Sequence, residues 1–321
     1  MAEFLADLVA PEHWADTIVA SIPTKAKLYG SDIVSKPPAT TDGKVGVFTF
    51  IPFVKELVDD WQKPVKATPL TPEAMLMDQQ KAVRVTRSKE ILFYKKELRD
   101  LGILVDNDQV ILANLDRMLG KLQSFWGKQI DKFIYNTLKG VFGSALTSTH
   151  QIDLGAQLNR KAIQSGKGLL TDSSEELTDL FCYSTVNQHL RSQGIIEQIP
   201  NYSAEIVNAP IMYQVEGAKI TISNLVDTTG TPITGYSNYL FGKGSIYFDM
   251  PYFVTEMIYD PRVGGGALSV VLTGDLCAHV PGTSYAGAAD PTDATIATAG
   301  SWTKVADHNQ DIKVVRILST N

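Results

Sequence analysis

The sequence predicts an α+β fold, in which helical segments precede a region dominated by strands. Three features carry this prediction. An apolar repeat with helical spacing covers residues 107–139, segments at 45–54 and 81–95 alternate with a period of two, and strand-like segments dominate after Gly194. Hydrophobic residues make up 44% and charged residues 20% of the chain, which is typical of a globular protein and excludes general disorder.

Residues 1–45 are predicted to form an arm. Two short apolar-faced helical stretches, at 4–9 and 14–19, begin this segment. Residues that favour extended or irregular backbone then follow: Pro23, Gly30, Pro37, Pro38 and Gly43. Such a segment gains little by folding alone, so we expect the arm to lie on another surface, such as that of a neighbouring copy.

The segment 46–98 is predicted to form an extended β-hairpin. Its first limb, 45–54, alternates between two faces, and Pro52 restricts that limb to a sheet edge. In the second limb, Val83 and Val85 alternate with polar residues, which is typical of a half-exposed strand. A two-stranded hairpin buries too little surface to be stable alone. We therefore expect the hairpin to rest on another part of the protein or on another copy.

Basic residues concentrate along the second limb of this hairpin. They are Lys81, Arg84, Arg87, Lys89, Lys95 and Lys96. One interpretation is a solvated strand face, and another is an interface with an acidic patch on a neighbouring copy. Nucleic-acid binding is the third, but it usually requires exposed aromatic residues, and Phe93 and Tyr94 fit better as packing residues. We take the inter-subunit interface as the functional prediction and keep the other two as alternatives.

Two helices are predicted in the middle of the chain. The first covers 107–139, is capped near Asp106, stops at Lys139 and Gly140, and would be about 50 Å long. The second covers 174–193, with a capping box of Ser173 and Glu176, and ends at Gly194. The first is several times longer than an average helix, so we expect it to cross the whole molecule.

Strands separated by glycines are predicted for the rest of the chain. The segments with alternating or continuous β-branched and aromatic residues are IEQIPNYSAEIV, MYQVEGAKITISN, GSIYFDMPYFVTEMIYD, GALSVVLTGDLCAHV and DIKVVRILS. Between the last two, residues 284–300 are rich in Ala, Gly and Thr, and this composition predicts a flexible surface loop.

No motif for catalysis, cofactor binding or metal binding is present in the sequence. The five histidines are isolated from one another, and no HExxH, CxxC or phosphate-binding loop occurs. Cys182 and Cys277 lie far apart and are expected to be reduced thiols. The net charge of −6 argues against a surface that binds nucleic acid broadly. We therefore predict no catalytic residue, no cofactor and no metal, and hence a protein that is not an enzyme.

The sequence also predicts a protein that does not enter a membrane. No apolar run approaches the ~20 residues that a membrane span requires. The first ten residues contain Glu3 and Asp7 but no basic residue, unlike a secretory signal. We expect the protein to be made, and to remain, in a cytoplasm.

The order of arm, hairpin, long helix and strands resembles the Hong Kong 97-type major capsid proteins of tailed phages. The segments that carry the resemblance are VFTFIPFVKELVDD and RVTRSKEILFYKKEL for the extended loop, LANLDRMLGKLQSFWGKQIDKFIYNTLKGVFG for the spine helix, LFCYSTVNQHLRSQGIIEQIP for a later helix, and GYSNYLFGKGSIYF and VTEMIYDPRVGGGALSVVL for sheet strands. The resemblance implies an N-terminal arm (1–45), an extended loop (46–98), a peripheral domain with the spine helix (99–142), and an axial domain with the remaining peripheral strands (143–321).

The resemblance also implies a function and a set of partners. A major capsid protein self-assembles through hexamers and pentamers into the icosahedral shell around double-stranded DNA, so this chain is expected in the virion after assembly in the host cytoplasm. The partners implied are a portal protein, a decoration protein and, because the arm is short, a separate scaffolding protein. Contact with packaged DNA is expected to be non-specific. The alternatives are an encapsulin-like nanocompartment shell protein and a hydrolase with an unrecognised site.

Overall fold

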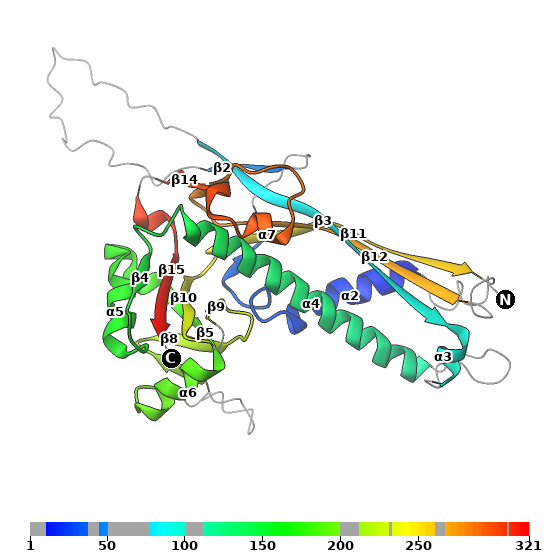
Figure 1. Cartoon of the computed structure of the whole chain (residues 1–321), viewed down its shortest axis with the longest axis horizontal. Coiled ribbons are helices and arrows are strands. Elements are labelled where there is room, and N and C mark those ends of the chain that lie inside the picture. The colour runs from blue at the N-terminus through cyan, green and yellow to red at the C-terminus, as the bar shows by residue number, and fades with distance from the viewer. Residues whose placement is uncertain are drawn as a thin grey trace, which may run out of the picture.

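The structure is a computed structural model, and it describes residues 11–37, 45–50, 78–100, 112–199, 212–230, 233–260, 267–306 and 308–320. Helices and sheets are mixed along the chain, which confirms the α+β prediction. Figure 1 shows an elongated half, in which the long helix α4 (Leu112–Gly143) runs beside long strands, and a more compact half that contains the C-terminal strand.

The elongated half is built on a five-stranded sheet. Its strands, in order of hydrogen-bonded neighbours, are β1 (Val34–Ser35), β11 (Ile246–Asp260), β12 (Ala267–His279), β3 (Asp78–Tyr94) and β2 (Val45–Phe50). The pairing of β2 with β3, from Val45 opposite Val83 to Phe50 opposite Asp78, confirms the two predicted limbs of the hairpin. β2 lies at the sheet edge as Pro52 predicts, whereas 51–77 lies outside the described residues.

The apolar stripe of the long helix is confirmed along the part whose side chains are described. Leu122, Trp126, Ile130, Ile134 and Leu138 are all buried. The predicted start at 107–111 lies outside the described residues. Because these residues recur every four positions, they form one ridge that packs against both sheets.

The predicted helix stop at Gly140 is wrong, because α4 continues to Gly143. Gly140 instead allows a close approach between the helix and the C-terminal part of the chain. A Cβ atom at this position would overlap the carbonyl oxygen of Ile296 and would lie 2.7 Å from Cδ1 of Trp302. The glycine is therefore a packing requirement within the helix rather than its end.

The described part of the arm lies on another surface, as expected, and that surface is the helix α4 of its own chain. Helix α2 (Pro11–Lys25) packs against α4, and Ile18, Leu28 and Ile33 are fully buried. Hydrogen bonds to one carboxylate hold the arm there. Asp131 on α4 accepts hydrogen bonds from the backbone N–H groups of Lys27 at 2.8 Å, Leu28 at 3.1 Å and Tyr29 at 3.4 Å, and we call this arrangement the Asp131 clasp. Residues 1–10 and 38–44 lie outside the described part.

The compact half is built on an eight-stranded sheet. Its strands, in order, are β4 (Gln151–Asp153), β15 (Val314–Thr320), β10 (Gly235–Gly242), β5 (Leu177–Cys182), β8 (Ala218–Ile222), β7 (Met212–Val215) and β6 (Glu197–Ile199), and β9 (Thr228–Thr229) also pairs with β10. This sheet, together with β11 and β12, confirms the predicted strand content after Gly194.

The predicted helix over 174–193 is only partly correct. Residues 171–176 form the 3₁₀ helix η2 (Thr171–Glu176), the next six form the central strand β5, and only α6 (Ser184–Ser192) is helical. Leu177, Leu180 and Phe181 satisfy a helical spacing, but all three are buried in the sheet core. Burial between neighbouring strands overrides the local pattern there. The predicted end is correct, because Gly194 has a left-handed φ of 67° directly after the helix.

The predicted flexible loop at 284–300 is wrong, because this segment is packed. The remaining elements of the chain are α3 (Lys95–Asp100), α5 (Arg160–Gly168), β13 (Thr283–Tyr285), α7 (Asp293–Ile296), η3 (Ala299–Ser301), β14 (Trp302–Lys304) and η4 (Asn309–Asp311). Ile296 is fully buried, and its carbonyl oxygen accepts the indole N–H of Trp302 at 2.9 Å. Tyr285, at the start of the segment, is buried in the same core, so two apolar side chains hold a segment whose composition is otherwise that of a loop.

Candidate assembly surface

The long strands β3, β12 and β11 present two chemically different faces. Towards α4, the side chains of Ile91, Phe93 and Phe253 pack around Trp126. On the opposite face, Leu92 is 42% exposed and Ile258 is 55% exposed, and both lie level with Ser269 on the strand between them. Tyr252, farther along the same face of β11, is 50% exposed. Several large apolar side chains gathered on one sheet face indicate a contact surface.

The structure gives Arg84 a partner within its own chain. Its guanidinium lies 2.8 Å from the Asp275 carboxylate, and the side chains are only 22% and 15% exposed. The other oxygen of Asp275 accepts a hydrogen bond from the Thr86 hydroxyl at 2.7 Å. This pair joins β3 to β12, so Arg84 stabilises the sheet as well as adding charge to its surface.

Arg87 also binds carboxylates of its own chain. Its guanidinium lies 3.6 Å from Asp290 and 3.1 Å from Asp293, and Lys132 on α4 lies 3.8 Å from Asp293. Asp290 in addition accepts the backbone N–H of Thr86 at 3.1 Å. These contacts fix the segment around α7 against β3.

The lysines of the predicted interface differ from Arg84 and Arg87 in their lack of described carboxylate partners. Lys81, Lys89 and Lys96 are exposed, and no carboxylate of the described ranges lies within ion-pair distance of them. The side chain of Lys95 lies outside the described part. The inter-subunit role of the basic residues remains a prediction. If a neighbouring copy binds this surface, the exposed lysines are the charges that are available to it.

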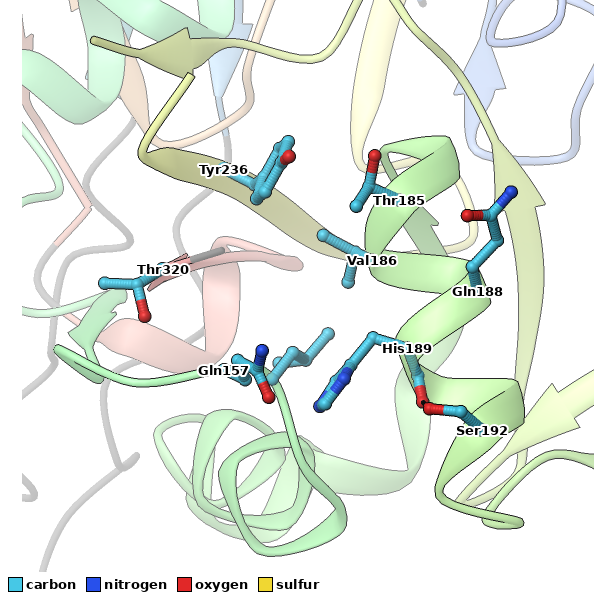
Figure 2. Close-up of a pocket in the computed structure, with 9 residues that line it drawn as sticks. Gln157, Thr185, Val186, Gln188, His189, Ser192, Tyr236 and Thr320 are labelled. Atoms are coloured by element: carbon cyan, nitrogen blue, oxygen red, sulfur yellow. Dashed lines mark hydrogen bonds between the residues drawn. The ribbon is translucent and has the colours of Figure 1, made fainter. Parts of the chain in front are cut away.

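One pocket lies in the compact half, between α6, β10 and the end of β15 (Figure 2). Its volume is about 320 Å³, and Leu158, Val186 and Tyr236 supply buried apolar groups. His189 is the one titratable imidazole that lines it, and its Nε2 lies 2.6 Å from the Gln193 amide nitrogen. Ser192 also lines the pocket, but its hydroxyl donates to the backbone carbonyl of His189 at 2.7 Å, so the described walls show no hydrogen bond between a hydroxyl and the imidazole ring.

The described ranges also lack the features of a metal site or a membrane span. No group of three or more His, Cys, Asp or Glu side chains in these ranges is placed to hold a metal ion. None of the helices in the same ranges combines the length and the apolar content that crossing a bilayer requires.

Comparison with known proteins identifies the fold through structure rather than sequence. No family model and no curated protein matches the chain. The structure of Microbacterium phage Oxtober96 matches with a TM-score of 0.53 and 8% identity, over 91% of this chain and 90% of that one. The capsid of a native GTA particle matches with a TM-score of 0.56 and 9% identity, over 94% and 90%. The capsid of Helicobacter pylori bacteriophage KHP30 matches with a TM-score of 0.53 and 8% identity, over 92% and 91%.

The chain has the Hong Kong 97-type capsid fold. This confirms the fold that the sequence resemblance implies. In this capsid fold, α4 is the spine helix and β2 with the start of β3 forms the base of the extended loop.

The base of the extended loop is fixed to the capsid fold by a buried hydrogen-bond group. The side-chain oxygen of Gln80 on β3 accepts the backbone N–H of Gly282 at 3.0 Å and lies 2.7 Å from Nε2 of His279. A carbonyl oxygen can only accept, so His279 donates from Nε2. Complete burial lowers the pKa of His279 to about 3.

We expect His279 to make the subunit less stable in acid. Its folded pKa of about 3 lies below the unfolded value of 6.5, so the unfolded state binds a proton first as the pH falls. The free energy of unfolding should therefore decrease between pH 6.5 and pH 3, by up to ~1.4 kcal/mol per pH unit from this residue. Urea unfolding of wild type and His279→Gln at pH 7, 6 and 5 tests this, and equal slopes for the two proteins would contradict it.

Both cysteines are buried thiols, and we expect them to be unreactive in the folded subunit. Burial raises the pKa of Cys182 and of Cys277 to about 12, so almost no thiolate is present at pH 8. A colorimetric thiol reagent should detect no fast-reacting thiol in native protein and two after denaturation. Rapid labelling of either cysteine in the native state would contradict the buried placement.

Proposed function

We propose that the chain is the major capsid protein of a tailed phage, which self-assembles into the icosahedral head shell around double-stranded DNA. The observation that carries this proposal is the capsid fold, which aligns over 94% of this chain with the GTA capsid chain. The exposed apolar face formed by Leu92, Tyr252 and Ile258 supports it, because an assembling subunit must bury such surface against its neighbours.

The proposed partners follow from this role. The subunit forms hexamers and pentamers with its own copies, and it meets a scaffolding protein, a portal protein and a decoration protein during assembly in the host cytoplasm. A net charge of −6 weakens binding to the packaged polyanion, so contact with DNA is non-specific. The mature location is the virion, and the division into arm, extended loop, peripheral domain and axial domain is part of the same proposal.

Electron microscopy of the protein, expressed alone and with the products of neighbouring genes, tests the proposal. Closed shells, or hexameric and pentameric rings, are the expected result. Shells that contain a cargo enzyme instead of DNA would favour the encapsulin-like alternative. A protein that stays monomeric and shows a saturable hydrolytic activity would contradict the proposal and favour the hydrolase alternative.

The exposed lysines of the basic cluster provide a sharper test of the interface. Changing Lys81, Lys89 and Lys96 together to Glu should reduce shell yield at least tenfold, because a complementary acidic surface would be repelled. The melting temperature of the unassembled subunit should change by less than ~3 °C, since no described ion pair is lost.

The matched control changes three other exposed lysines, Lys128, Lys161 and Lys243, to Glu with the same change in net charge. Normal shells from the control and few shells from the test variant support the interface. Normal shells from both variants would assign Lys81, Lys89 and Lys96 to a solvated face.

A further inference from the structure

The two edges of the five-stranded sheet differ in a way that bears on assembly. On one side, β11 is covered by β1 only at Ile246 and Tyr247 and then carries Pro251 within a bulge between Asp249 and Tyr252. A bulge and a proline hinder the pairing of a further strand at that point of the edge. The other edge, formed by β3, carries neither of these features from residue 84 to residue 94.

The β3 edge is open because its neighbour is short. β2 covers β3 only from Asp78 to Val83, whereas the pairing of β3 with β12 on its other side continues without a register shift to Tyr94. From Arg84 to Tyr94, therefore, no strand of the described ranges lies beside the outer edge of β3.

At the two ends of this open stretch, carboxylates of the same chain accept the outward backbone N–H groups of β3. The backbone N–H of Thr86 points away from β12 and donates to Asp290 at 3.1 Å. Since direction alternates along a strand, Ser88, Glu90, Leu92 and Tyr94 point the same way. The N–H of Tyr94 donates to Glu97 at 3.3 Å. Across the parts of the chain that the structure describes, nothing bonds the N–H groups of Ser88, Glu90 and Leu92.

A small pocket lies beside the open stretch, between β3 and the spine helix. Its volume is about 120 Å³, and its walls include Lys89, Phe125, Trp126 and Gln129. Lys89 lies on this face, opposite Leu272 of the buried cluster, and has no carboxylate partner among the described residues. The indole N–H of Trp126 is buried without an acceptor. Arg87 and Asp293 also line the pocket, but they form an ion pair with each other at 3.1 Å, so Lys89 leaves the lining with one net positive charge beside an apolar wall.

We propose that the open edge of β3, from Ser88 to Leu92, accepts an extended segment of a second copy of this chain. The segment adds one strand to the sheet and places an acidic side chain in the pocket beside Lys89. This inference rests on the proposed shell-forming function. Main-chain hydrogen bonds supply affinity in such strand addition, and the adjoining pocket supplies specificity.

Charge and geometry favour a second copy as the occupant. The chain carries 35 acidic and 29 basic residues, so acidic segments are available on every subunit. Direct pairing of β3 with β3 of another copy would place two Lys89 side chains opposite each other in the register centred on this residue, which is unfavourable. Pro251 and the bulge interrupt the β11 edge, whereas the β3 edge continues without interruption from Arg84 to Tyr94 and is the longer site for an added strand.

Amide hydrogen exchange, resolved by residue, tests the inference in assembled shells and in unassembled subunits. The amides of Ser88, Glu90 and Leu92 should exchange at least tenfold more slowly in shells. Those of Thr86 and Tyr94 serve as internal controls, since they are already bonded within the subunit and should change little.

Backbone variants give an independent readout. Glu90→Pro removes an outward N–H without removing a main-chain bond to β12, whereas Glu90→Ala keeps that N–H. Both variants lose the bond that the Glu90 carboxylate accepts from the Ser269 hydroxyl of β12 at 2.6 Å, so this loss cancels in the comparison. Shell yield should fall at least tenfold for Glu90→Pro and stay near wild type for Glu90→Ala. Circular dichroism of the unassembled subunits verifies that both variants fold.

The outcomes separate this inference from the proposed function. Wild-type shells in which Ser88, Glu90 and Leu92 exchange as fast as in free subunits would overturn the inference and leave the shell function intact. Normal shells from a folded Glu90→Pro subunit would also overturn it. Failure of the wild-type protein to form shells under any condition would remove the proposed function and this inference together.

Discussion

Replacing Gly140 with valine is expected to lower the free energy of unfolding by ~3 kcal/mol or more. Gly140 lies within the spine helix, where an added Cβ would overlap the carbonyl oxygen of Ile296 and lie 2.7 Å from Cδ1 of Trp302. A backbone carbonyl cannot rotate away as a flexible side chain can, so α7 must separate from α4. The buried side chain of Ile296 would then lose its contacts with the main core.

Urea unfolding of the unassembled subunit measures this effect, and Gly120→Ala is the matched control. Gly120 lies in the same helix, but no atom lies within 4 Å of a Cβ there. Removing a helical glycine at an open position should stabilise the subunit by up to ~1 kcal/mol. Equal effects of Gly120→Ala and Gly140→Val would contradict the close approach at Gly140.

Replacing Asp131 with alanine is expected to destabilise the subunit by ~3 kcal/mol and to release the arm. The carboxylate accepts backbone N–H groups of Lys27, Leu28 and Tyr29, and its removal leaves these partly buried donors without an acceptor. Burial is the largest influence on the pKa of Asp131 and raises it, while the N–H bonds oppose that change. Asp131→Asn should cost less, because its side-chain oxygen still accepts while its NH₂ group cannot.

Limited trypsin cleavage and urea unfolding test this prediction together. Cleavage at Lys25 and Lys27 should become faster in Asp131→Ala, because the clasp no longer holds the backbone on α4. Lys128→Ala, an exposed change on the same helix, is the control and should match wild type in both assays. Unchanged cleavage in Asp131→Ala would show that the buried residues Ile18, Leu28 and Ile33 suffice to hold the arm.

Elements with a long and regular pattern could be predicted from the sequence. The repeat that includes Leu122, Trp126 and Ile130 specifies a helix over several turns. Apolar and polar residues alternate along β3, the second limb of the hairpin, and this pattern specifies a strand. Short central segments could not be predicted in the same way. β5 has six residues and a spacing that fits either a helix or a strand, and its position in the middle of the eight-stranded sheet decides between them.

The candidate surface shows the same limit for side chains. The basic residues of β3 are evident in the sequence, but the partners of Arg84 and Arg87 lie about two hundred positions away, at Asp275, Asp290 and Asp293. No local rule joins charges over that separation. The surface on which the arm lies could not be predicted for a related reason: a single buried carboxylate, Asp131, gives no signal in the sequence that it binds three backbone groups of a distant segment.

The continuity of β3 has a mechanical consequence for a closed shell. One strand of 17 residues joins the base of the extended loop to the sheet that rests on the spine helix, and Gln80 fastens that base to Gly282. Tilting the base would have to twist this strand along its whole length or rotate the sheet and helix with it. We therefore expect the base of the extended loop, the five-stranded sheet and the spine helix to move as one rigid body between sites of different curvature in a shell.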